Sequence, residues 1–119
     1  MIKITLPLPP SANQNYSHGR NGVYLSPQSR IYRQEVALML NQMDITPIVG
    51  DVSITVHVYR KRRDYDVSNA SKILEDVLQG YCYLDDVQIK ESHYYREYDP
   101  KNPRVEIEIE AVYPLVGKA

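Results

Sequence analysis

Cysteine is almost absent from this chain, which contains Cys82 alone among its 119 residues. A single cysteine excludes an internal disulfide and leaves no second cysteine for a zinc site. We therefore expect Cys82 to pack as a small hydrophobe beside Tyr81 and Tyr83. Long apolar runs are missing as well, since no stretch approaches the ~20 apolar residues that a membrane span requires. The sequence thus predicts a protein without a membrane partner.

An excess of charge of either sign is also missing. The chain has 14 Lys+Arg and 15 Asp+Glu, a net charge of -1 that neither demands nor excludes a polyanionic partner. Met1 leads directly into an alternating pattern, without the basic, apolar and small-residue succession of a secretory signal, and we therefore expect a cytoplasmic protein. The length fits a single domain, residues 1–119.

Hydrophobic periodicity defines the expected elements. Apolar residues alternate with polar ones in four segments that we interpret as strands, and recur at helical spacing in two others. The strands are expected at residues 2–6, 51–59, 87–95 and 105–110, and the helices from Ser26 and Pro27 to about residue 43 and at about residues 69–79. The order βαβαββ predicts one α+β domain with a mixed four-stranded sheet and two main helices. Residues 11–25 have no usable period and are expected to form a loop long enough to carry function.

Two aspartate pairs flank the second helix. Asp64 and Asp66 follow one strand, whereas Asp85 and Asp86 precede the next. Whether the pairs converge depends on strand direction, which the sequence leaves open. Converging carboxylates would favour a hard cation such as Mg²⁺, and the alternative is that both pairs lie in solvated turns.

A polar stripe is expected on the same helix, because Asn69, Lys72 and Asp76 fall at positions i, i+3 and i+7. Lys72 could form an ordinary i,i+4 ion pair with Asp76. The functional alternative is a cation held close to a phosphate, where an ammonium stabilises developing negative charge.

The stretch from residue 66 to 88, read as D-x-S-N-x-x-K-x-x-x-D-x-L and then L-D-D-x-Q, resembles the RusA family of Holliday junction resolvases, small phage-associated endonucleases. LPLPPSANQNY and SPQSRIYR are similar to the family's Pro-Pro-Ser-x-Asn opening and its Ser…Tyr-Arg helix entry. The resemblance covers most of the chain in the correct order.

The resemblance implies roles for individual residues. Asp66 and Asp86 would bind Mg²⁺ and orient a water, with Asp85 beside them, and Lys72 would aid the phosphodiester chemistry. The family pattern D-x-D-N-x-x-K puts its second aspartate on Ser68, which is a neutral oxygen ligand or else the N-cap of the helix. Pairing Asp64 with Asp66 restores D-x-D but breaks the spacing to Asn69 and Lys72. Glu75, seven residues beyond Ser68, is a further candidate ligand, although ~10 Å away along the axis.

DNA contacts are expected from basic and amide side chains in the loops and on the second helix. These candidates are Asn13, Asn15, Arg20, Lys61, Arg62, Arg63, Asn69 and Lys72, with Tyr16 and Tyr24 able to stack on bases. For Arg60, covering a sheet edge is an equal alternative. The row Glu106, Glu108 and Glu110 is expected to form a solvated sheet face that points away from DNA.

These expectations combine into a homodimeric, Mg²⁺-dependent nuclease, with Mn²⁺ as a possible substitute, that cuts a four-way DNA junction by symmetric nicks. A two-fold axis would relate the two sites. The alternatives are a non-catalytic module that binds branched DNA and a structural interaction domain without a nucleic acid partner.

Overall fold

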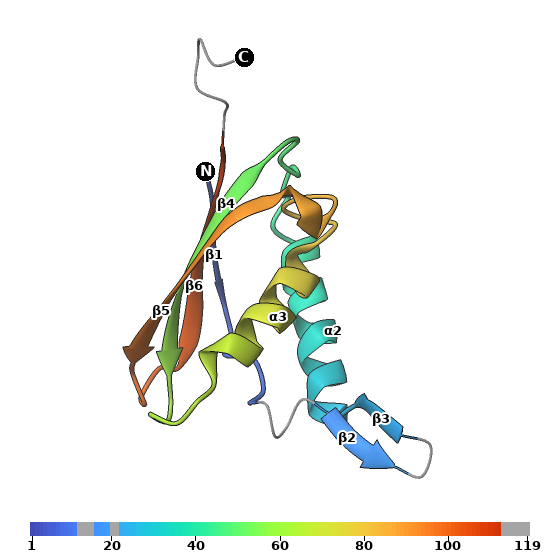
Figure 1. Cartoon of the computed structure of the whole chain (residues 1–119), viewed down its shortest axis with the longest axis vertical. Helices are drawn as coiled ribbons and strands as arrows, with labels where there is room; N and C mark the ends of the chain where they lie inside the picture. The colour runs from blue at the N-terminus through green and yellow to red at the C-terminus, as the bar shows by residue number, and fades with distance from the viewer. Residues whose placement is uncertain (12–15, 20–21, 113–119) are drawn as a thin grey trace.

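The main sheet has four strands in the order β1-β6-β4-β5, and two helices cover one of its faces (Figure 1). The computed structural model describes residues 1–11, 16–19 and 22–112, with side chains for residues 1–11 and 26–112. The elements of this layer pair are β1 (Ile2–Leu6), α2 (Pro27–Asn41), β4 (Val52–Arg60), α3 (Val67–Leu78), β5 (Ile89–Tyr98) and β6 (Arg104–Ala111). The predicted α+β class and the order βαβαββ are therefore confirmed.

Strand direction within the sheet determines where the loops before and after α3 lie. β6 is antiparallel to both β1 and β4, whereas β4 and β5 are parallel, with Arg60 opposite Tyr98 at their carboxyl ends. α3 is the crossover between the two parallel strands and runs back along the sheet (Figure 1). The loop that enters α3 and the loop that leaves it consequently lie at opposite ends of the molecule.

One segment differs from the sequence prediction. Within the expected loop of residues 11–25, β2 (Tyr16–Gly19) and β3 (Gly22–Leu25) form an antiparallel pair in which Gly19 lies opposite Gly22. Strands of four residues are too short to establish a period, so the pattern analysis missed them. The Asn21-Gly22 dipeptide was the available signal in the sequence, because Asn-Gly is typical of tight hairpins.

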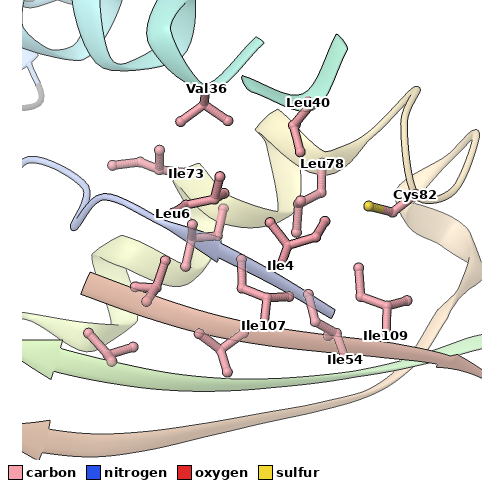
Figure 2. Packing of buried hydrophobic residues seen from close by; sticks show 14 of the residues in the cluster. Ile4, Leu6, Val36, Leu40, Ile54, Ile73, Leu78, Cys82, Ile107 and Ile109 are labelled. Atoms are coloured by element: carbon pink, nitrogen blue, oxygen red, sulfur yellow. The ribbon is translucent and has the colours of Figure 1, made fainter. Parts of the chain in front are cut away.

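The core fills the space between the helices and the sheet (Figure 2). Val36 and Leu40 of α2 and Ile73 of α3 face the apolar side chains of β1, β4 and β6. Cys82 is fully buried, as expected of a small hydrophobe, and burial raises the pKa of its thiol to about 11. No helix in the described part of the chain is long and apolar enough to cross a membrane.

The opposite face of the sheet is polar. In β6, Val105, Ile107 and Ile109 are buried while Glu108 and Glu110 are exposed, because consecutive side chains of a strand point to opposite faces. The glutamate row therefore lies on the uncovered face, as predicted.

Candidate functional site

Asp66 ends the loop after β4 and begins α3. Its Oδ1 accepts hydrogen bonds from the backbone N–H groups of Ser68 (2.9 Å) and Asn69 (3.3 Å), which makes Asp66 the N-cap of the helix. The helix begins at Val67, two residues before the expected start. Asp66 Oδ2 accepts no hydrogen bond from the described residues, and the side chain is exposed. One carboxylate oxygen thus caps the helix, and the other has no partner among the described residues.

Ser68 is not the N-cap, which corrects that part of the prediction. It occupies the second helical position and is exposed, and its backbone N–H is one of the two groups that donate to Asp66. The physical reason is that the aspartate two residues earlier can reach both free N–H groups. The Ser68 hydroxyl is therefore not required to start the helix.

The predicted basic residues cluster after β4. Lys61, Arg62 and Arg63 are all exposed. Arg62 lies 3.2 Å from the Asp64 carboxylate, and both of these side chains are about three-quarters exposed (77% and 73%), so the pair is weak. The guanidinium of Arg63 lies 4.4 Å from the ring centroid of Tyr98, at the end of β5. All three cations remain accessible to a polyanion.

Arg60 has a different role from its neighbours. Its Nε donates to the carbonyl of Glu97 at 2.9 Å, and its Nη1 donates to the carbonyl of Arg63 at 2.8 Å. These bonds tie the loop that carries the other basic residues to the end of β5.

A groove of about 810 Å³ lies beside this loop. Its walls include Pro7 and Pro10 from the segment after β1 and Ile31 from α2, and Lys61 and Arg62 line its edge. The Tyr65 hydroxyl donates to the carbonyl of Pro9 at 2.7 Å, in the same way as Tyr32 donates to Pro7. Two motifs that are far apart in the sequence, LPLPP and KRRDYD, are therefore brought together. Ile31 was not predicted to line a groove. Its side chain is 54% exposed although it belongs to an amphipathic helix, and this exposure is known only from the structure.

The second aspartate pair lies in a short 3₁₀ helix, η1 (Asp86–Gln88). Asp85 is its N-cap, with Oδ1 accepting from Val87 N–H at 3.0 Å. The backbone N–H of Asp86 donates to the side chain of Gln79, the residue that follows α3, at 3.2 Å. Both carboxylates are exposed next to the carboxyl end of α3.

Gln88 holds this turn rigidly. Its Oε1 accepts from the backbone N–H groups of Leu84 (2.9 Å) and Asp85 (3.0 Å). Its Nε2 donates to the carbonyls of Ile48 (2.8 Å) and Gly50 (2.7 Å) in the loop before β4. The glutamine of the L-D-D-x-Q motif, for which the sequence suggested no role, is thus a clamp between two loops.

The two aspartate pairs do not converge within one chain. α3 has 12 residues and so spans about 18 Å, with Asp66 at its start and Asp86 beyond its end (Figure 1). The parallel pairing of β4 and β5 decides this, because the start of β5 lies at the opposite end of the sheet from the end of β4. Among the described residues, no group of three or more His, Cys, Asp and Glu side chains could hold a metal ion. Asp66, Ser68, Asp85 and Asp86 of a single chain therefore do not fit one ion together.

On the polar stripe of α3, the structure excludes the predicted alternative of an ion pair between Lys72 and Asp76. Asp76 pairs with Arg33 of α2, not with Lys72, and Lys72 is exposed. Asn69 has a buried Nδ2 that finds no partner among the residues described. Glu75 accepts from the hydroxyl of Tyr94 on β5 at 2.7 Å, and this contact favours a structural role for Glu75 over metal binding.

Three predicted DNA contacts, Asn13, Asn15 and Arg20, lie outside the described residues. Tyr16 and Tyr24 lie in β2 and β3, where only the backbone is described.

Comparison with known proteins gives a consistent result. The family model described as Endodeoxyribonuclease RusA matches residues 7–110. The crossover junction endodeoxyribonucleases RusA of Escherichia coli (strain K12) and of Enterobacteria phage 82 are each 33% identical to the chain, over 111 and 112 residues. That of Shigella sonnei is 32% identical over 111 residues. Each alignment covers 89% of this chain and 91% of the relative.

Proposed function

The chain belongs to the RusA family of endodeoxyribonucleases, and from that premise we propose that it resolves four-way DNA junctions by paired symmetric nicks that require Mg²⁺. The enzyme class, a structure-specific endodeoxyribonuclease with branched DNA as substrate, follows from the family. The proposed place of action is the cytoplasm. The metal requirement, the paired cuts and the assembly of the enzyme are the parts that need support from its residues.

The separation of Asp66 from Asp86 is the observation that carries the proposal of a dimer. Two symmetric nicks are most simply made by two sites related by a two-fold axis. If α3 of one copy lies alongside α3 of a second copy in the opposite direction, the start of each helix meets the end of the other. Asp66 of one copy and Asp86 of its partner would then share a site, although about 18 Å of helix separates them within either chain.

At such a shared site Asp66 and Asp86 would hold the ion, since carboxylate oxygens suit Mg²⁺ and also Mn²⁺. The ion would supply positive charge to the reacting phosphate. Asp66 can contribute Oδ2 while its Oδ1 keeps the helix capped. Lys72 would place its ammonium against a phosphate oxygen from the exposed face of α3, with Asn69 one turn earlier. Lys61, Arg62 and Arg63 would bind the phosphates of the arms.

A mixing experiment tests the shared site. Asp66→Asn and Asp86→Asn should each abolish cleavage of a synthetic four-way junction in Mg²⁺ while leaving junction binding intact. When the two variant proteins are unfolded, mixed and refolded, each mixed dimer regains one complete site, and nicking of one strand should return. The matched control is Asp66→Asn refolded with itself.

Two outcomes would contradict the proposal. If mixed dimers form and bind junctions but stay inactive, Asp66 and Asp86 do not share a site across the dimer. If the unmodified protein cleaves no junction with either Mg²⁺ or Mn²⁺ but binds it, the chain is the non-catalytic binding module.

A further inference from the structure

Lys72 is surrounded by positions at which an acidic side chain could neutralise it. On a helix, residues three and four apart are neighbours, so Glu75 and Asp76 are both within reach of the Lys72 ammonium. Position i-4 is Ser68, which carries no charge. An exposed lysine with two acidic neighbours on its own helix ordinarily spends part of its time paired with one of them.

Both acidic neighbours are instead held by other elements. The carboxylate of Glu75 accepts from the Tyr94 hydroxyl (2.7 Å) and from Ser92 Oγ (3.5 Å), both on β5. A tyrosine hydroxyl is protonated at neutral pH at its ordinary pKa of about 10. Burial, followed by the hydrogen bond to Glu75, raises the pKa of Tyr94 further, so its hydroxyl is a donor to Glu75. Asp76 is bound on the other side of the helix by Arg33 of α2.

Arg33 is itself oriented by α2. Its Nε donates to the hydroxyl of Ser29, one turn earlier, at 3.4 Å. The Ser29 side chain is buried, and the Arg33 side chain is 24% exposed against 63% for Asp76. The guanidinium therefore extends from a partly buried base toward a solvated carboxylate. Within the described part of the chain, Lys72 has no ion pair.

We propose that Arg33 is a positioning residue for cleavage: by holding Asp76 on the α2 side, it keeps the ammonium of Lys72 available to the DNA phosphate. This inference rests on the role proposed above for Lys72. A phosphate gains most from a cation that is not already paired, because a competing carboxylate must be displaced before the ammonium can approach. Without Arg33, Asp76 would become such a competitor at the i+4 position of an exposed helix.

The size of the effect follows from the strength of such pairs. An i,i+4 pair on an exposed helix is populated about 1.4- to 2.3-fold over its open form, which leaves roughly a third of the lysine unpaired, and salt weakens it. Arg33→Gln should therefore slow single-turnover cleavage about two- to threefold at low ionic strength. The defect should shrink as salt is raised, at enzyme concentrations that keep the DNA fully bound.

Three double variants separate this role from charge, stability and DNA affinity. Asp76→Asn added to Arg33→Gln should restore the cleavage rate, because the competing carboxylate is gone. Glu108→Gln added to Arg33→Gln restores the same net charge on the far face of the sheet and should not restore the rate. In a Lys72→Met background, Arg33→Gln should have no further effect. Thermal unfolding of each variant provides the stability reference.

The outcomes are distinguishable. If Arg33→Gln cleaves like the unmodified enzyme, if Asp76→Asn fails to restore the rate, or if Arg33→Gln still slows the Lys72→Met variant, the positioning role is overturned while the proposed function stands. If Lys72→Met alone cleaves normally, the role of Lys72 in the proposed function falls, and the role of Arg33 falls with it.

Discussion

At the scale of single residues, Asp66 combines a structural and a proposed chemical role in one carboxylate. Its Oδ1 caps α3, and its Oδ2 accepts no hydrogen bond from the described residues. Asparagine caps helices about as well as aspartate does, whereas alanine does not. The two roles can therefore be separated by substitution.

Asp66→Asn should lose cleavage and keep its stability, while Asp66→Ala should lose cleavage and about 1 kcal/mol of unfolding free energy. Urea denaturation followed by circular dichroism measures the second quantity. Equal stability of the two variants would show that the cap contributes nothing to folding. Ser68→Ala provides the matched control, because the Ser68 hydroxyl does not cap the helix.

At the scale of elements, the turn that contains Asp85 and Asp86 is rigid because Gln88 makes four hydrogen bonds to two loops. Each such bond contributes about 0.5–1.5 kcal/mol net, and the glutamine amide supplies both the acceptor and the donor. A carboxylate of the same shape can only accept. It would face the carbonyls of Ile48 and Gly50 without a donor.

Gln88→Glu should consequently destabilise the protein by about 2 kcal/mol, and by at least as much as Gln88→Ala. We also expect it to raise the Mg²⁺ concentration needed for half-maximal cleavage, since Asp86 loses its fixed position. Chemical denaturation and a Mg²⁺ titration of junction cleavage measure the two effects. A Gln88→Glu variant with normal stability would indicate that the clamp is unimportant.

At the scale of the whole molecule, charge is segregated although the chain is nearly neutral. Lys61, Arg62 and Arg63 lie at one end, and the glutamates of β6 occupy the uncovered sheet face. The positive and negative charges cancel in the net charge of the chain. They do not cancel locally, because salt screens a charge beyond the Debye length, about 8 Å at physiological salt. The glutamates of β6 point to the uncovered sheet face, and the exposed cations of the loop after β4 remain accessible to DNA.

Replacing both Lys61 and Arg62 by Gln should weaken junction binding and reduce the slope of log K against log salt by about 2, since each cation that no longer neutralises a phosphate lowers the slope by about one unit. Fluorescence anisotropy over a salt series provides the slope. The control is Lys3→Gln on the uncovered sheet face, which should leave the slope unchanged. An unchanged slope in the double variant would show that DNA binds to another surface of the protein.

The sequence by itself determined which segments form strands and helices, which faces are buried and which family motifs are present. These properties are local, because alternation and helical spacing are read from neighbouring residues such as Val52 to Val58. The hairpin of β2 and β3 was not predicted for the same reason, because a strand of four residues is too short to establish a period.

Only the tertiary structure decided how the motifs lie relative to one another. Alternation identifies the buried face of β4 but not the direction of its neighbour β5, and the parallel pairing of the two strands puts Asp66 and Asp86 at opposite ends of α3. The partner of Asp76 likewise depends on how α2 packs against α3. This packing places Arg33 beside Asp76 and leaves Lys72 exposed. Contacts between elements distant in sequence depend on packing, and no local pattern records them.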